Sequence, residues 1–297
     1  MPAEVRPEPA RGLGALVCGP GTIAILFWGA SFVATKRALE GFEPFALVAL
    51  RFAIGAAFVA SVQLARGREL LPERADLARC VLLGLVLALH IGVQAFALLH
   101  TSALHSGWLV ALSPVAIAIG AALFLGERVS ARAWAGIAIA TAGALLVVFS
   151  RGLALDEAST ADLAVLGTCL TWAAYTLLGR TPVARSGAFR VTPLVMGIAA
   201  LVSGGFAFAS TARTPEATST ASVVALLVLG LGASGIAFTA WAAAVDRLGA
   251  TRAGALLYFQ PFVTLALSIT LLDEPWSWLA LAGGPLVLAG VALVGRR

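Results

Sequence analysis

Long runs of apolar residues, separated by short polar segments, are the feature that most restricts how this chain folds. A membrane-spanning helix needs about 20 predominantly apolar residues. With 60% hydrophobic and only 12% charged residues, the chain has too few polar side chains to cover a soluble domain of its size. We therefore predict an all-α polytopic membrane protein with ten transmembrane helices. The predicted spans are residues 21–38, 44–65, 79–99, 103–125, 131–149, 163–179, 191–209, 222–244, 250–272 and 278–295.

The distribution of lysine and arginine predicts how these helices are oriented. If both ends of the chain lie on one side, that side carries fifteen Lys and Arg residues, whereas the other side carries four, namely Lys36, Arg37, Arg151 and Arg213. Cytoplasmic loops are enriched in these residues, so we expect both termini in the cytoplasm. Residues 1–20 are polar and proline-rich, do not resemble a cleavable signal peptide, and are expected to form a cytoplasmic tail.

An internal repeat divides the chain into two halves. A shift of 144 residues places Trp28 on Trp172 and Lys36 on Arg180. A shift of 147 residues aligns Gly107 with Gly254, Pro114 with Pro261, Glu127 with Glu274, Ser130 with Ser277, Gly136 with Gly283 and Gly143 with Gly290. The predicted halves are residues 21–149 and 163–297, joined by an external linker at 150–162. Because each half has five spans, the second enters the membrane from the opposite face, which is the inverted repeat of secondary transporters.

Several of these residues also form motifs of a known family. Trp28-Gly29-Ala30-Ser31-Phe32, followed by Lys36, Pro44 and Arg51, resembles the opening of the first repeat in the drug/metabolite transporter superfamily, EamA type. Ser113-Pro114, Leu125-Gly126-Glu127-Arg128, Gln260-Pro261 and Leu272-Asp273-Glu274 resemble later motifs of the two repeats. The resemblance covers nearly the whole chain. It implies export of amino acids, metabolites or drugs across the inner membrane of a bacterium, and it extends to the aromatic amino acid exporter branch.

Polar residues deep in the predicted spans are the first candidates for substrate binding, because such groups are costly in lipid. His90 and Gln94 are four residues apart and share one helical face. They either line a cavity, which we favour, or form hydrogen bonds between helices.

Aromatic residues within spans are the second set of candidates. Large rings there either fill the core or line a cavity that suits an aromatic or apolar side chain. The set comprises Trp28, Trp172 and Trp241, with Tyr175, Tyr258 and Gln260 adding polar tips at middle depth.

The sequence allows two roles for each of the charged residues and prolines considered next. Arg51 and Lys36 either extend to the membrane surface or attract a substrate carboxylate in the outer half of the pathway. Pro114 and Pro261 interrupt helical hydrogen bonding and are expected to be fixed kinks that also serve as hinges. For Glu274 we expect stabilisation of the helix that follows it, with a gate latch as the secondary alternative.

Missing motifs narrow the function further. The sequence has no HExxH, GxSxG or Walker A motif, and its three cysteines and three histidines lack metal-ligand spacing, so we expect neither an enzyme nor a cofactor or metal site. Every Asp and Glu is predicted in a tail, a loop or at a span end. A facilitative carrier is therefore expected, with proton antiport through His90 as the alternative. A passive channel is less favoured than a carrier. The expected partners are a small molecule and the bilayer, without nucleic acid, and one chain should suffice as a functional monomer.

Overall fold

The computed structural model describes residues 19–125, 130–148, 150, 157–210, 218–248, 253–254, 256–275 and 278–295. The described residues form helices and connecting turns, without a strand. Within them, seven helices are long and apolar enough to cross a membrane, and three further apolar helices are shorter. The all-helical fold of a polytopic membrane protein is thereby confirmed.

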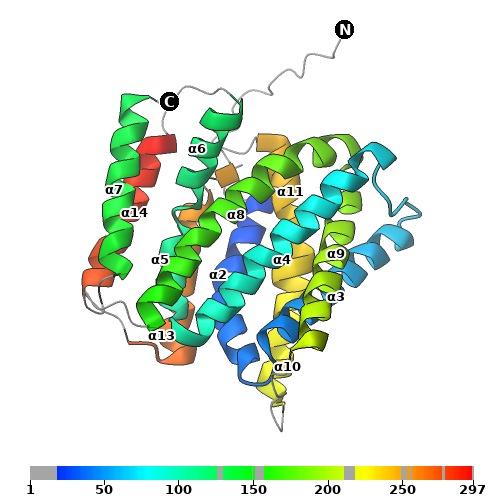
Figure 1. Ribbon diagram of the computed structural model, residues 1–297, viewed down its shortest axis with the longest axis horizontal. Helices are drawn as coiled ribbons and strands as arrows, with labels where there is room; N and C mark the ends of the chain where they lie inside the picture. The colour runs from blue at the N-terminus through cyan, green and yellow to red at the C-terminus, as the bar shows by residue number, and fades with distance from the viewer. Residues whose placement is uncertain are drawn as a thin grey trace.

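The helices follow the predicted spans closely in most places (Figure 1). The first half contains α2 (Pro20–Leu39), α3 (Pro44–Ala65), a short 3-10 turn η1 (Arg74–Asp76), α4 (Leu77–His100), α5 (Ala103–Val110), α6 (Ser113–Leu125) and α7 (Ala131–Val148). The second half contains α8 (Glu157–Ser186), α9 (Ala188–Ala209), α10 (Thr220–Leu227), the π-helical segment η3 (Val228–Ile236), α11 (Ala237–Leu248), the 3-10 turn η4 (Leu257–Phe259), α13 (Gln260–Leu272) and α14 (Trp278–Gly295).

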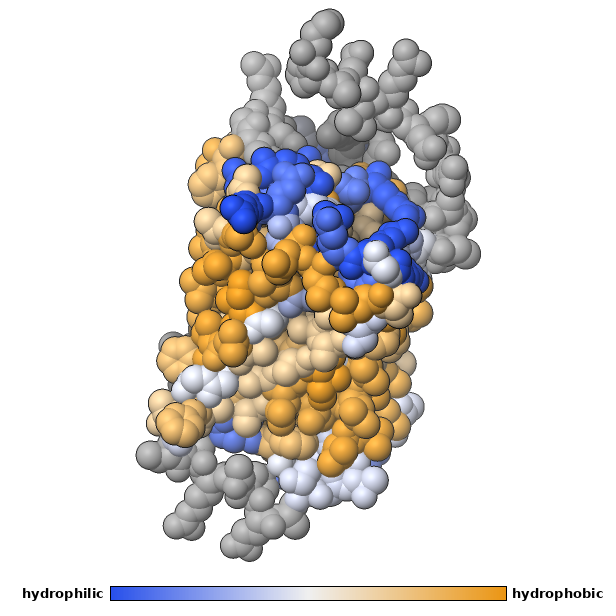
Figure 2. Space-filling view, turned by 90° about the vertical axis from the view of Figure 1, so that its right-hand side faces the viewer, coloured by the Kyte–Doolittle hydropathy of each residue, from blue (hydrophilic) through white to orange (hydrophobic). Residues whose placement is uncertain are grey.

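The surface is that of an integral membrane protein. Figure 2 shows broad apolar surface across the middle of the face in view, with hydrophilic residues gathered mainly at one end. Large apolar side chains such as Leu201, Phe208 and Leu170 are 78%, 95% and 69% exposed within this fold. Such surface is stable in contact with lipid and not with water.

Two predicted spans are broken near their prolines. The predicted helix 103–125 stops at Val110, turns through two residues and restarts at Ser113, so that Pro114 occupies the second position of α6. Pro261 likewise occupies the second position of α13, directly after η4. At the start of a helix the missing N–H of proline costs no hydrogen bond. Each proline therefore lies at the start of a new helical segment, next to a break in its predicted span.

Small residues allow the closest helix contacts. Helices α7 and α14 lie side by side at one edge of the bundle (Figure 1), and a Cβ atom added to Gly143 would lie 2.6 Å from the backbone nitrogen of Val287. At the opposite edge, α3 packs on α9 and on η3, where Gly55 faces Ser234. At these positions the small residues let neighbouring helices approach closely.

One helix boundary differs from the prediction in a way that affects the site. Helix α8 begins at Glu157, so it includes half of the predicted linker 150–162. Asp162 lies in its second turn and is 0% exposed. Its position near a span end agrees with the expectation for acidic residues, but its burial inside the bundle was not expected.

Candidate functional site

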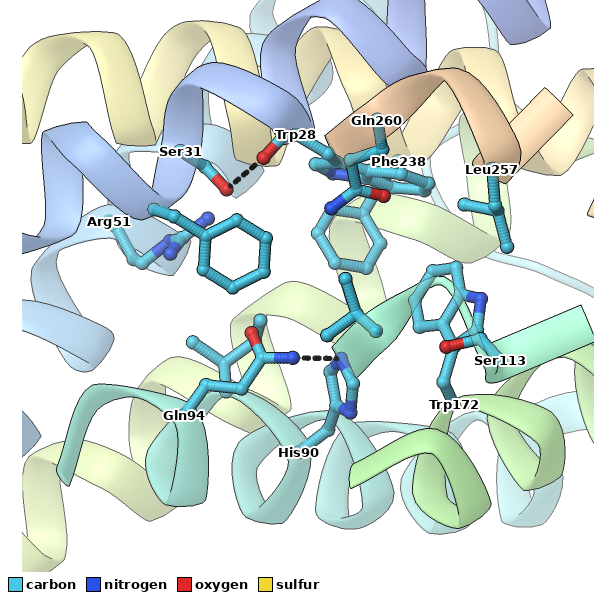
Figure 3. A pocket seen from close by; sticks show the side chains of 13 residues that line it. Trp28, Ser31, Arg51, His90, Gln94, Ser113, Trp172, Phe238, Leu257 and Gln260 are labelled. Carbon is cyan, nitrogen blue, oxygen red and sulfur yellow. Dashed lines mark hydrogen bonds between the residues drawn. The ribbon is translucent and has the colours of Figure 1, made fainter. Parts of the chain in front are cut away.

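A central cavity is enclosed by segments from both halves of the chain (Figure 3). It has a volume of about 40 Å³, and thirteen residues line it. Since a water molecule needs about 10–15 Å³ of such space, the cavity holds only a few waters in this conformation. Six predicted substrate residues line it: Trp28 from α2, Arg51 from α3, His90 and Gln94 from α4, Trp172 from α8 and Gln260 from α13.

His90 and Gln94 line the cavity and also bind the facing helix α8. His90 Nδ1 lies 2.9 Å from Thr171 Oγ1, and Gln94 Nε2 donates to Thr168 Oγ1 at 3.2 Å. Gln94 Nε2 also lies 3.4 Å from His90 Nε2, the contact drawn in Figure 3. Both interpretations made from the sequence therefore apply. The two residues line the cavity, and hydrogen bonds between helices hold them there.

Arg51 is the cationic group of the cavity. Its side chain is 4% exposed, so it does not extend to the membrane surface. Its Nε donates to Ser234 Oγ at 3.1 Å, and the guanidinium lies over the Phe52 ring at 5.6 Å. Within the described residues Arg51 has no ion-pair partner. A buried guanidinium without a carboxylate is well suited to bind an anionic group of a ligand.

The π-helical segment η3 places both its serine and a backbone carbonyl beside the cavity. Ser234 accepts the hydrogen bond from Arg51, and the Ala233 carbonyl accepts one from Trp28 Nε1 at 3.0 Å. A π-helical turn widens the backbone spacing and frees carbonyl groups from the ordinary ladder, and it is frequent at functional sites. Nothing in the residue pattern had indicated this segment.

Aromatic rings form one wall of the cavity. The Trp28 ring centroid lies 5.0 Å from that of Trp172 and 5.4 Å from that of Trp241, and Trp172 stacks on Tyr175 at 5.4 Å. Phe238, which the sequence analysis did not single out, packs edge-on against Trp28 at 5.2 Å. Trp241 and Tyr175 do not line the central cavity but lie directly behind its aromatic wall.

A second cavity of about 160 Å³ lies behind this wall, between α4, α8, α9 and α11. Tyr175 and Trp241 line it, together with Thr176, Arg180 and Asp246. Trp172 lines the central cavity and stacks on Tyr175, which lines the second cavity, so the two cavities share this pair of stacked rings.

Lys36 takes part in a different contact from the one predicted. It lies at the opposite end of the bundle from Arg180, where its Nζ donates to the Thr101 carbonyl at 2.6 Å and lies 3.8 Å from Glu274. It does not line the central cavity. Glu274 accepts hydrogen bonds from the backbone N–H groups of Ala103 and Leu104 at 2.8 and 2.9 Å. The carboxylate thus caps α5 in the first half, and the expectation that it stabilises the following helix is wrong.

A buried polar cluster lies beside these contacts of Lys36 and Glu274, and the sequence did not indicate it. Asp162 Oδ2 lies 2.8 Å from His105 Nδ1, and its other oxygen accepts from Thr101. His105 Nε2 in turn lies 3.2 Å from Ser150 Oγ. The residues come from α5, α8 and the ends of two other segments, so no local pattern brings them together.

Some candidates fall outside the described part of the chain. Tyr258 lies in η4, but its side chain is not described, and Glu127 and the tail up to Cys18 also lie outside the described residues. Cys80 and Cys169 are buried free cysteines. No group of three or more His, Cys, Asp or Glu that could hold a metal occurs among the residues that the structure describes.

An integral membrane bundle whose central cavity combines a buried cation, hydrogen-bonding side chains and an aromatic wall defines a membrane transport protein for small molecules. The EamA-like transporter family model matches the chain twice, at residues 17–149 and 159–296. The chain belongs to this family, whose members are transporters and not enzymes, as the sequence predicted.

Individual relatives agree with this assignment. The chain is 31% identical over 293 residues to a "Probable terminal-alkyne amino-acid exporter" of Streptantibioticus cattleyicolor, with 93% of this chain and 92% of that protein covered. It is 27% identical to the uncharacterized transporter YcxC of Bacillus subtilis, with 92% and 91% covered. A solved crystal structure with 26% sequence identity superposes with a TM-score of 0.70 and covers 93% of this chain and 95% of its own.

Proposed function

We propose that this protein is a secondary transporter that exports amino acids, with aromatic and other apolar ones first, across the inner membrane of a bacterium. The observation that carries the proposal is Arg51, a buried cation without a carboxylate partner that lines a central cavity beside the Trp28 and Trp172 rings. The guanidinium binds the substrate carboxylate, and the rings contact its side chain. The named exporter of a modified amino acid among the relatives supports the same class of substrate.

Alternating access is the proposed mechanism. The two matches of the family model support two halves of five helices each with inverted orientation, and the cavity receives residues from both halves. Its small volume is that of an occluded conformation, in which the substrate site is nearly closed. The segments that end beside Pro114 and Pro261 are the proposed hinges, because a short break lets one helical piece move relative to the next.

Orientation and assembly follow from the charges and from the cavity. The excess of Lys and Arg at one end of the bundle supports cytoplasmic termini. Since one chain supplies the whole central cavity, we propose a functional monomer.

Energy coupling has two candidate forms. The sequence favours facilitated diffusion or exchange, because His90 was the one titratable residue expected deep in the membrane. The buried pair of His105 and Asp162 supports the alternative of proton antiport, since a histidine and a carboxylate linked by a hydrogen bond can exchange a proton with either side.

Counterflow in proteoliposomes tests the function and the coupling together. Purified protein is loaded with unlabelled amino acids, and the uptake of labelled phenylalanine, tryptophan or tyrosine is followed with and without a pH gradient. Saturable, stereoselective uptake without a gradient is the expected result, and an absence of uptake across a full amino-acid panel would shift the proposal to organic cations or other metabolites. Accumulation driven by the pH gradient, abolished by Asp162→Asn but not by His90→Ala, would establish antiport through the His105–Asp162 pair.

A further inference from the structure

The second cavity has the size of an aromatic side chain, whereas the central cavity does not. Its volume of about 160 Å³ compares with about 40 Å³ for the central cavity. An apolar protein cavity of about 150 Å³ is large enough to bind benzene. Of these two cavities, the one behind the aromatic wall is therefore large enough for a ring in this conformation.

The cavity also carries one side chain of each charge. Arg180 follows Thr176 by four residues on α8, which places both on one face of that helix. Asp246 lies on α11, and both charged residues line the cavity and are exposed at its open end. Within the described part of the chain, neither has a hydrogen bond or an ion pair. A site with one cation and one anion fits a ligand that carries both charges and no net charge.

We propose that this cavity is a second binding site for the amino-acid zwitterion, occupied before the substrate passes Trp172 into the central cavity. Arg180 binds the carboxylate, Asp246 binds the ammonium group, and the side chain lies against Tyr175 and Trp241. This inference rests on the proposed amino-acid substrate. It adds a site at the arginine-rich end, next to the stacked rings of Trp172 and Tyr175 that the two cavities share.

Equilibrium dialysis of labelled phenylalanine against purified full-length protein in detergent tests the second site. Arg51→Met disables the central cavity and should leave binding of one phenylalanine per chain. Adding Arg180→Gln or Asp246→Asn should weaken this remaining binding at least tenfold. The matched control is Arg247→Gln, which removes the same charge from the exposed last turn of α11, outside the cavity, and should change nothing.

The chemical class of ligand is tested in the Arg51→Met chain by competition. Phenethylamine lacks the carboxylate and 3-phenylpropionate lacks the ammonium group, so each should compete at least tenfold less well than unlabelled phenylalanine. If the Arg51→Met chain binds no phenylalanine while the wild type transports it, the second site is refuted and the proposed function stands. Equal effects of Arg180→Gln and Arg247→Gln would also refute it. Failure of the wild type to bind or transport any amino acid would overturn the proposed function and this site together.

Discussion

Replacing Arg51 by methionine tests whether the buried charge serves substrate binding or the stability of the fold. Methionine has a similar length and no charge. The effective penalty for burying an unpaired ion is several kcal/mol, and in this structure Arg51 recovers part of it from two contacts. Its hydrogen bond to Ser234 contributes about 2 kcal/mol and its contact with the Phe52 ring about 1 kcal/mol. The free energy of unfolding of Arg51→Met should therefore stay equal to that of the wild type or rise by about 1–2 kcal/mol.

Thermal unfolding in detergent, with and without substrate, measures the change in stability and the loss of substrate binding. Without substrate, the variant should unfold at the wild-type temperature or a few degrees above it. With phenylalanine at 100 times its dissociation constant, the wild type should gain about 2.7 kcal/mol. The variant should lose the part of this gain that comes from the central site, and its transport of amino acids should fall by at least a hundredfold.

The opposite pattern would refute the reasoning. If Arg51→Met unfolds well below the wild type and still transports phenylalanine at a comparable rate, Arg51 has a structural role and the carboxylate binds elsewhere. Phe52→Leu is the control, since it weakens packing beside the same guanidinium and leaves the charge in place. It should lower the unfolding temperature and retain transport.

Other contacts make further predictions. Gly143→Ala should destabilise the protein by about 2 kcal/mol or more, because the new Cβ would lie 2.6 Å from the Val287 nitrogen. Gly197→Ala, where the Cβ meets nothing within 4 Å, should be neutral or stabilising by about 0.5–1 kcal/mol. Equal unfolding temperatures for the two variants would contradict the packing of α7 on α14. Glu274→Gln should weaken the cap of α5 by about 1 kcal/mol and speed phenylalanine counterflow, whereas slower counterflow at unchanged stability would mean that the contact is not a latch.

The sequence predicted the parts of the molecule that depend on local pattern. The helix Pro44–Ala65 was predicted to the residue, because Glu43 and Pro44 mark its start and a charged segment follows its end. His90 and Gln94 were predicted to share a face because helical periodicity alone decides that. The candidate substrate residues within spans divide between two cavities, a division that depends on how separate helices pack and not on their sequence.

Residues that owe their position to distant partners could not be predicted. Glu274 caps a helix 170 residues away along the chain, and Asp162 pairs with His105 across two helices. From sequence, an acidic residue near a span end has the same appearance whether it faces water or the bundle. The π-helical segment η3 was missed for a related reason, since its widened turn is stabilised by packing and by contacts from Trp28 and Arg51.

The contacts at the end opposite Arg180 indicate which part of the bundle must move to open the central cavity. Helix α5 is only eight residues long and is followed by a break before Pro114. Glu274 accepts hydrogen bonds from its first N–H groups, and Asp162 contacts His105 in its first turn, so polar contacts from two other segments hold the start of α5. Val110, the last residue of α5, lines the central cavity. We therefore propose that release of the Glu274 and Asp162 contacts lets α5 move and so changes the wall of the substrate site.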